Sequence, residues 1–376
     1  MPGPAVIDLF SGFGGLTAGF LSQGFDLEAA VDADSVALGI LGGNAAATRA
    51  QLRCVTLRAK DDWTAKAQQP PPRKSLHLHA TSPCQSHSHA KRYRDAHARE
   101  EGLAMFRHAI ETPLRRGDRS FTLEQVAHQS AIDLAQAFAN AFPERVAYTV
   151  LDASDLGSPS SRRRLIVGDP QTIKALKEEP TVKVSVRAAL ERYRLEPPAT
   201  AKWVGVNRGA HADVGKHRSL EDCAPTVVAS HPLNWFDADG ASVRCLRPAE
   251  SAALMGFSKR WKLPRKQRDA QRAVGNAIPV ALSKAMARSV RASMGEEAQP
   301  AEPISQAALD AVAAPAAAAA APETAAAPGS AAAEARAVVE ELNAISRQVG
   351  TLVERATKLA RKLDRNQQGD APGAGC

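Results

Sequence analysis

The sequence contains few cysteines, no long apolar run and no visible leader. Its 376 residues include five cysteines, an odd number without a C-x-x-C pair, which argues against a disulfide framework and a zinc cluster. No stretch approaches the roughly 18 uninterrupted apolar residues that a membrane helix requires. The first residues carry no basic segment before the first apolar run, so we expect no secretory signal. These absences indicate a protein of a reducing, cytoplasmic environment.

Charge is distributed unevenly along the chain. The formal net charge is +8. Residues 296–376 contain 7 Lys+Arg and 11 Asp+Glu, a net charge of −4, which leaves +12 on residues 1–295. A basic body suggests phosphate backbones as partners, because Lys and Arg displace condensed counterions from nucleic acid. Ordinary solubility charge is the alternative explanation.

The last eighty residues divide into two segments of different composition. Residues 296–333 are rich in Ala, Pro, Glu, Ser and Gly, a composition that predicts a disordered linker. Residues 334–366 have apolar side chains at alternating spacings of three and four, which predicts an amphipathic helix and a coiled coil. The apolar positions are Ala335, Val338, Leu342, Ile345, Val349, Leu352, Ala356, Leu359 and Leu363. We hypothesise self-association through this helix; packing on the body is the alternative.

The body begins with a pattern typical of an α/β protein that binds a nucleoside. An apolar run at Ala5–Phe10 is followed by a glycine turn at Ser11–Gly15 and by a helix start at Leu16–Gln23. A second apolar run, Leu27–Val31, ends at Asp32. Glycines let the backbone approach a ligand, and an acid about 20 residues later can accept hydrogen bonds from ribose hydroxyls. A glycine turn followed by an acid also occurs in α/β proteins without such a site.

Cys84 stands directly after a proline and just beyond a short strand-like run, Leu76–Ala80. A cysteine in this position lies at the sheet edge where open α/β folds bind ligands. Its thiolate can act as a nucleophile when nearby positive charge favours it. A buried cysteine that acts as a small apolar residue is the alternative.

Six blocks of sequence occur in an order that is typical of one enzyme family. They are Asp8–Gly15, Pro83–Gln85, Phe121–Val126, Leu156–Leu165, Leu246–Phe257 and Gln271–Pro279. On these blocks, spread over roughly Val6–Met294, the chain resembles the cytosine-C5 DNA methyltransferases, which use S-adenosylmethionine. The resemblance implies an α/β class I methyltransferase: a Rossmann-like fold with a mixed seven-stranded sheet and a small target-recognition lobe. A C-terminal helical tail would follow.

The resemblance also implies roles for individual residues. Cys84 would add to carbon 6 of cytosine, Glu124 would hold N3, and Arg162 and Arg164 would act near the base carbonyl and the backbone. The residues implied for the cofactor are Phe10, Ser11, Gly12, Gly14, Gly15, Asp32, Pro83 and Asn276. Those implied for contacts with double-stranded DNA, in a mobile loop that helps to flip the base, are Gln85, Ser88, Lys91, Arg92 and Arg94.

Histidines flank the cysteine in alternation, at His77, His79, His87 and His89. A metal site is one interpretation of them, but no cysteine or carboxylate completes a ligand set. A positively charged segment that contacts DNA phosphates is the better interpretation of these histidines, and we expect no metal. The helix Ala277–Val290 is expected to return to the first strand and close the large lobe.

The blocks predict the domain organisation. Residues 1–168 form the catalytic and cofactor-binding lobe, residues 169–242 the target-recognition region, and residues 243–295 return to the catalytic lobe. If the source is bacterial or phage, we expect a cytoplasmic, nucleoid-associated protein.

The sequence departs from the family pattern at several positions: Gln125 replaces an Asn, Ser82 a Pro, Ser160 a Gln and His87 an apolar residue. The Gly-Asp pair of the family's third block is not evident near Cys54–Leu57. Two other functions therefore stay open. One is a tRNA cytosine-C5 methyltransferase, although the Cys-Phe-Thr signature of that group is missing. The other is a DNA-binding module that has lost turnover.

Overall fold

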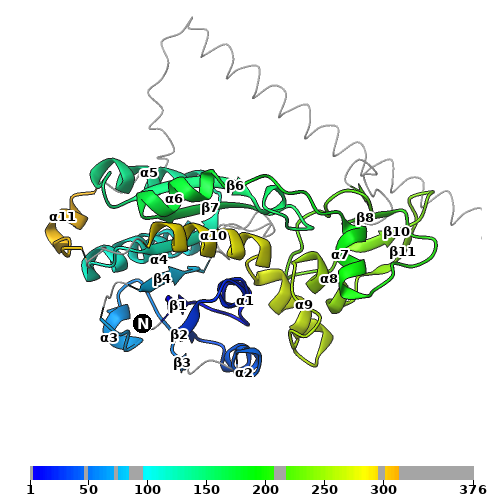
Figure 1. Ribbon diagram of the computed structural model, residues 1–376, viewed down its shortest axis with the longest axis horizontal. Helices are drawn as coiled ribbons and strands as arrows, with labels where there is room; N and C mark the ends of the chain where they lie inside the picture. The colour runs from blue at the N-terminus through cyan, green and yellow to red at the C-terminus, as the bar shows by residue number, and fades with distance from the viewer. Residues whose placement is uncertain are drawn as a thin grey trace, which may run out of the picture. The chain divides into compact units, whose positions relative to one another are not determined.

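The computed structural model describes residues 3–45, 50–71, 75–83, 96–206, 217–294 and 301–312. These residues form a large α/β lobe and a smaller lobe with its own sheet (Figure 1). Residues 318–376 form a separate unit that lies outside the described residues. The predicted heptad helix, residues 334–366, lies in that unit. No helix of the described residues is long and apolar enough to cross a membrane.

The large lobe is built on a seven-stranded mixed sheet. The strand order is β3-β2-β1-β4-β5-β7-β6, and β7 is antiparallel to both of its neighbours while the other pairs are parallel. The strands are β1 (Ala5–Leu9), β2 (Asp26–Asp32), β3 (Gln51–Cys54), β4 (Leu76–Ala80), β5 (Phe121–Val126), β6 (Ala147–Asp152) and β7 (Arg163–Gly168). This arrangement confirms the mixed seven-stranded sheet that the resemblance implied.

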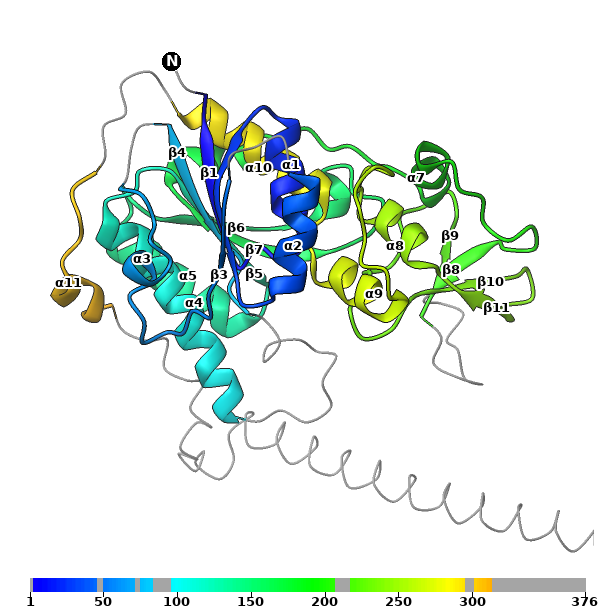
Figure 2. The same ribbon diagram turned by 90° about the horizontal axis from the view of Figure 1, so that it is seen from below.

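Helices cover both faces of this sheet (Figure 2). The first face is covered by α1 (Gly15–Ser22), α2 (Ser35–Asn44), α6 (Pro170–Lys177) and α10 (Val280–Ser293). The second is covered by α3 (Trp63–Lys66), α4 (Ala96–Arg116), α5 (Gln129–Ala141) and α11 (Gln306–Asp310). Because both faces are buried, central strands such as β1 are apolar at nearly every position and do not alternate.

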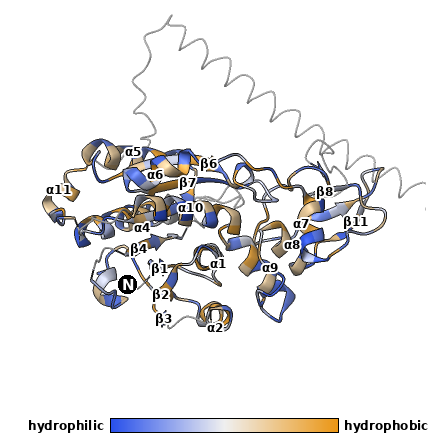
Figure 3. Ribbon diagram, in the orientation of Figure 1, coloured by the Kyte–Doolittle hydropathy of each residue, from blue (hydrophilic) through white to orange (hydrophobic). Residues whose placement is uncertain are grey.

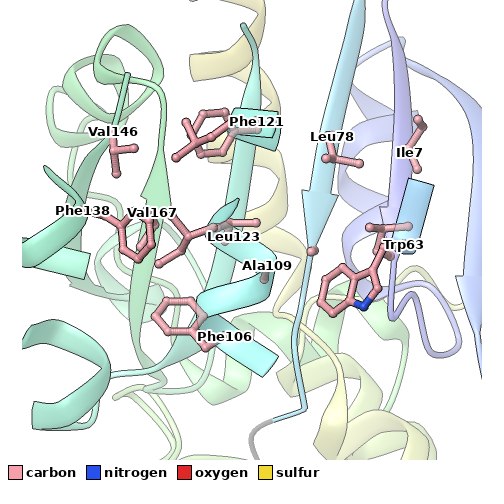
Figure 4. Packing of buried hydrophobic residues seen from close by; sticks show 14 of the residues in the cluster. Ile7, Trp63, Leu78, Phe106, Ala109, Phe121, Leu123, Phe138, Val146 and Val167 are labelled. Carbon is pink, nitrogen blue, oxygen red and sulfur yellow. The ribbon is translucent and has the colours of Figure 1, made fainter. Parts of the chain in front are cut away.

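The larger apolar cluster lies between the sheet and the second set of helices. Phe106 and Ala109 of α4 pack with Phe121 and Leu123 of β5, and Trp63 closes the cluster at the β1 end (Figure 4). On the opposite face, α6 buries Ile173 and Leu176 and presents lysines to solvent, so its exposed side is hydrophilic (Figure 3). The amphipathic helices thus close the sheet on both sides.

The smaller lobe has an antiparallel four-stranded sheet of order β11-β10-β8-β9. Its strands are β8 (Trp203–Gly205), β9 (Arg218–Ser219), β10 (Asn234–Phe236) and β11 (Ser242–Cys245), and its helices are α7 (Val186–Tyr193), α8 (Pro248–Leu254) and α9 (Gln267–Asn276). Trp235 and Leu254 lie at the centre of its apolar core.

The boundaries of this lobe differ from the expected 169–242. Helix α6 packs on α10 and on β6 and β7, so it belongs to the large lobe. At the other end, β11, α8 and α9 contribute to the core of the small lobe, beyond residue 242. The expected boundaries followed the sequence blocks, whereas the lobes are defined by which apolar faces pack together.

Helix α10 begins at Val280, three residues after the expected start at Ala277. Pro279 occupies its N-cap position with φ −57°. Proline is well suited to this place because it has no N–H to leave unsatisfied. Helix α10 packs along α1, and the hydroxyl of Ser283 donates to the carbonyl oxygen of Leu16 over 2.5 Å. The large lobe is therefore closed by a helix encoded more than 250 residues after its first strand, as the sequence predicted.

Part of the expected linker is packed on the large lobe. Residues 301–312, here called the terminal strap, contain α11 and bury Leu309 and Val312 against the second face of the sheet. Arg107 of α4 donates to the carbonyl oxygens of Leu309 (2.8 Å) and Val312 (3.1 Å). The backbone N–H of Ala301 donates to the carbonyl oxygen of Gly117 over 2.9 Å. The prediction of a disordered linker is therefore wrong for these twelve residues.

Candidate active site

Glu124 of β5 and Arg164 of β7 form an ion pair at one edge of the large sheet. Nε of Arg164 lies 2.5 Å from Oε1 of Glu124, and the two side chains are only 10% and 5% exposed. The antiparallel register brings them together, since Val126 lies opposite Arg164 and Glu124 opposite Ile166. The attraction between these two buried charges holds the carboxylate beside the guanidinium. Oε2 of Glu124 has no partner among the described residues and is available to a substrate.

Arg162, the other expected catalytic arginine, connects the two lobes. Its guanidinium donates to the carbonyl oxygens of Val227 (2.9 Å) and Gly275 (3.1 Å). Its own backbone N–H donates to Asp152, which also accepts from the hydroxyl of Ser161. The side chain is buried, so these bonds hold the small-lobe segment and the end of α9 against β7. Among the described residues, the guanidinium of Arg162 therefore bonds to backbone groups, and Arg164 pairs with Glu124.

The end of β4 leads into the segment of the proposed nucleophile. Ser82 is buried there, and the side-chain amide of Gln125 donates to its hydroxyl over 3.0 Å. Pro83, the next residue, is exposed. Cys84 and the expected DNA-contacting residues Gln85, Ser88, Lys91, Arg92 and Arg94 lie outside the described residues. The structure thus describes the two residues that lead to Cys84 and the carboxylate on the neighbouring strand.

The glycine turn after β1 has a conformation that leaves room for a ligand. Gly12 has φ +54°, and a Cβ at this position would meet no atom within 4 Å. Phe10 also has a positive φ, +61°, which is strained for an aromatic residue, and its ring lies edge-on to Trp63 at 5.1 Å. Gly15 approaches the segment after α9, where a Cβ would lie 2.6 Å from the carbonyl oxygen of Ile278. This contact places Ala277 and Ile278, which directly follow the exposed Asn276 at the end of α9, next to Gly15.

Asp32 occupies the predicted place at the end of β2. Its Oδ2 accepts from the backbone N–H of Gly12 over 2.7 Å, and its Oδ1 accepts from that of Asp34 over 2.8 Å. A carboxylate can accept about four hydrogen bonds, so capacity remains for two hydroxyl donors. These two hydrogen bonds hold the glycine turn and the Asp32 carboxylate in a fixed arrangement.

These residues fit a nucleoside-bearing cofactor such as S-adenosylmethionine. The hydroxyl of Ser11 is buried and has no hydrogen-bond partner among the described residues. Such a group is costly unless a ligand or water satisfies it. Together with the open space at Gly12 and the remaining acceptor capacity of Asp32, it forms a polar cradle. Among the residues singled out from the sequence, Gly14 serves packing, because a Cβ there would collide with Leu41 and Trp261.

Asp8 lies beneath this cradle and is fully buried. Burial raises its pKa to about 7, against a hydrogen bond from Thr17 that lowers it, and the nearby charge of Asp32 raises it further. The hydroxyl of Thr17 lies 2.7 Å from Oδ2 of Asp8. The carboxyl group of Asp8 therefore titrates near neutral pH.

His77 and His79 of β4 are structural in the described part of the chain. Their rings form a chain of contacts with the hydroxyls of Ser120, Thr122 and Thr81, at 2.8 to 3.0 Å. Burial lowers the pKa of His77 well below its usual value and that of His79 to about 3, so both rings are neutral. No cluster of three or more metal-ligating side chains occurs among the described residues. His87 and His89 lie outside them.

Sequence reasoning missed two features of this site. Ser82 and Gln125 were treated as separate departures from a pattern, although they form one hydrogen bond across β4 and β5. Trp63 was not singled out, although it stands beside Phe10 and donates from Nε1 to the carbonyl oxygen of Arg58. Two departures at the ends of neighbouring strands could have signalled the hydrogen bond between Ser82 and Gln125. The sequence contains no signal for the position of Trp63 beside Phe10.

The sheet order, the antiparallel β7 and the cradle at the ends of β1 and β2 define a class I methyltransferase. Within that class, the chain belongs to the C-5 cytosine-specific DNA methylase family, whose family model matches residues 5–184 and 217–292. No curated protein matches the chain significantly. S-adenosylmethionine is the cofactor that methyltransferases of this family generally use.

Solved structures with the same fold are similar over most of the chain. One is a proposed DNA modification methyltransferase encoded within a prophage (E. coli), with 18% identity and a TM-score of 0.53, covering 77% of this chain and 99% of that chain. Another is a DNMT2 mutant from Spodoptera frugiperda, with 15% identity and a TM-score of 0.52, covering 77% and 99%. The S. pombe Dnmt2 methyltransferase has 16% identity and a TM-score of 0.50, covering 78% and 99%. At these identities the similarity supports the fold.

Proposed function

We propose that the protein transfers a methyl group from S-adenosylmethionine to carbon 5 of a cytosine in double-stranded DNA. The observation that carries this proposal is the buried pair of Glu124 and Arg164, which lies one strand away from the segment that leads to Cys84. A fixed carboxyl group suits the ring nitrogen N3 of cytosine when its second oxygen carries a proton, because N3 accepts a hydrogen bond. The basic charge of residues 1–295 supports a nucleic-acid substrate.

The cofactor would be held by the residues of the cradle. Asp32 would accept hydrogen bonds from ribose hydroxyls, and Ser11 would bond to a polar group of the amino-acid end. Gly12 lets the backbone approach closely because nothing fills the position of its Cβ. Phe10, Gly15, Pro83 and Asn276 would complete the walls. When bound, S-adenosylmethionine supplies an electrophilic methyl group.

Cys84, Glu124 and Arg164 would activate the base. Carbon 5 of cytosine is a poor nucleophile until the thiolate of Cys84 adds to carbon 6 and shifts electron density into the ring. Glu124 in its protonated form would donate a hydrogen bond to N3 as negative charge develops on the ring, and Arg164 keeps that carboxyl group in place. After methylation, carbon 5 loses its proton and the Cys84 thiolate leaves, which restores the aromatic ring. The cytosine must leave the base stack for these groups to reach it.

Labelled S-adenosylmethionine tests the proposal directly. The protein is incubated with either duplex DNA or tRNA, and we expect label in the DNA. Label in tRNA alone would favour the RNA-modifying alternative, and no label in either would favour a binding module. Cys84→Ala should abolish transfer and retain DNA binding. Cys245→Ala, an exposed cysteine at the end of β11, is the matched control and should keep full activity.

Self-association through residues 334–366 also remains a proposal. Its basis is the heptad pattern of the sequence. Light scattering should give a larger mass per particle for the full chain than for a chain truncated after Val312, which keeps the terminal strap. An equal monomer mass for both would contradict it.

A further inference from the structure

The connection between α8 and α9 concentrates positive charge. Residues 258–266, here called the basic loop, contain no acidic residue. Their five cationic side chains are all exposed: Lys259, Arg260, Lys262, Arg265 and Lys266. Among the described residues, none of these side chains has an ion-pair or hydrogen-bond partner. The loop therefore presents uncompensated charge to solvent.

The fold holds this loop in a fixed conformation. The side chain of Asn44 bonds to both backbone groups of Lys262: its Oδ1 accepts from the N–H over 2.7 Å and its Nδ2 donates to the carbonyl oxygen over 3.1 Å. The half-buried ring of Trp261 packs against Phe257 with a centroid distance of 5.8 Å. Holding like charges together is unfavourable without a counter-charge. The anchoring of this loop therefore indicates a site for a polyanionic partner and not an incidental cluster of charges.

A cavity beside the basic loop extends the positive surface. Its volume is about 450 Å³, and its lining includes Lys259 and Arg260 together with Arg192 of α7 and Lys284 of α10. Arg288 of α10 also lines it and is the one cation among these that pairs with a carboxylate, that of Glu179. The described lining contains no acidic side chain. Cations from three separate elements thus converge on one concave surface.

This cavity is separate from the active site. Leu156, Gly157 and Pro159 form one of its walls. A few residues later, Arg162 turns instead to the carbonyl oxygens of Val227 and Gly275. Of the residues assigned to the base or the cofactor, none that the structure describes lines the cavity. A ligand could therefore occupy the cavity while the catalytic pocket is also filled.

We propose that the basic loop and this cavity form a second binding site for the phosphodiester backbone of double-stranded DNA. The proposal rests on the proposed function, because the partner is the substrate DNA outside the target cytosine. Lysine and arginine contacts of this kind release counterions and add affinity without reading sequence. The site would keep the enzyme on DNA while the catalytic pocket searches for its target.

Fluorescence anisotropy of the full-length protein with a long duplex tests the proposal across a range of salt concentrations. The test variant is Lys259→Gln with Arg260→Gln. The matched control removes two exposed charges from α6, by Lys174→Gln with Lys177→Gln. We expect the test variant to bind about three- to tenfold more weakly and its salt slope to fall by about 2, since each phosphate contact contributes about 0.9. The control should bind like the unaltered protein.

The binding assay does not depend on methyl transfer. A protein that transfers no methyl group, but whose test variant binds DNA more weakly than the control, would refute the proposed function and support the second site. Equal affinities and salt slopes for the two variants would overturn the second site. Calorimetry with tripolyphosphate adds one further outcome. If the test variant loses binding of this anion but binds DNA normally, the cavity is a site for small anions and the proposal is wrong.

Discussion

The side-chain amide of Gln125 donates a hydrogen bond to the hydroxyl of Ser82 over 3.0 Å, between the ends of β5 and β4. The other end of the amide accepts from the backbone N–H of Val126 over 2.8 Å. Ser82 and Gln125 are two of the places where the sequence departs from the family pattern. Their contact shows that the two departures form a single matched pair next to Pro83 and Cys84.

This pairing predicts that the two positions are coupled. Ser82→Pro or Gln125→Asn alone should lower methyl transfer and stability, because each leaves a buried polar group without its partner, at a cost of about 1–3 kcal/mol. The double variant, which carries the residues expected from the family, should recover much of both. A double-mutant cycle of activity and denaturant unfolding measures the coupling. Additive losses would show that the two residues act independently.

The ion pair of Glu124 and Arg164 should contribute differently to stability and to activity. Arg164→Met leaves a buried carboxylate unpaired and should lower the free energy of unfolding by roughly 3 kcal/mol. Adding Glu124→Gln removes that charge and should restore most of the stability, while methyl transfer stays lost. Urea unfolding and the label assay measure the two effects. Restored activity in the double variant would contradict the role given to Glu124.

Asp8 should make stability depend on pH near neutrality. Its pKa is about 7 in the folded protein and 3.8 in the unfolded chain, so the folded state keeps a proton that the unfolded state loses. Its contribution to stability therefore falls as pH rises from about 4 to 7. Relative to the unaltered protein, Asp8→Asn should gain up to about 4 kcal/mol between pH 4 and pH 8.

Unfolding in urea at several pH values measures this difference. Other buried groups also add a pH dependence, including His77 and His79, because burial lowers their pKa values in the folded protein, but they are common to both proteins and cancel in the comparison. A difference in free energy of unfolding that stays constant with pH would show that Asp8 does not carry the shift.

The terminal strap should stabilise the large lobe. Leu309 is fully buried against the second face of the sheet, so Leu309→Ala should lower the free energy of unfolding by about 2–4 kcal/mol. Ala311→Ser, at an exposed position of the strap, is the control and should change it little. Thermal unfolding of both variants provides the comparison. Equal melting temperatures would mean that the strap is not bound in solution.

The elements that the sequence predicts well are those whose signals lie close together along the chain. The apolar runs before and after the glycine turn gave β1 and β2 to within a residue or so, and Leu76–Ala80 is β4 as predicted. The position of Asp32 followed from its spacing alone. The blocks that contain Glu124 and Arg164 were recognised by their order along the chain, but the sequence did not predict that the two side chains would pair. In these cases the signal lies within a few residues or in a repeated pattern.

The features that were missed depend on distant contacts. Arg162 bonds to carbonyl groups 65 and 113 residues away, and no local pattern shows that a backbone oxygen will be its partner. The strap is hidden by its Ala- and Pro-rich composition, because the groups that hold it, such as Arg107 of α4 and the backbone of Gly117, lie on distant parts of the chain. The lobe boundaries likewise depend on which helix faces meet in three dimensions.

The packing of α1 against α10 has a consequence for synthesis on the ribosome. Leu16 and Phe20 of α1 are covered by Leu282 and Met286 of α10, which is translated about 270 residues later. At a translation rate of 5–20 residues per second, the apolar side of α1 stays uncovered for roughly 15 to 55 s before α10 is synthesised. During that time the whole small lobe is produced between the two helices. The nascent chain thus exposes the apolar surface of α1 for most of its translation. We expect the yield of folded protein in cells to depend on chaperones that bind this surface.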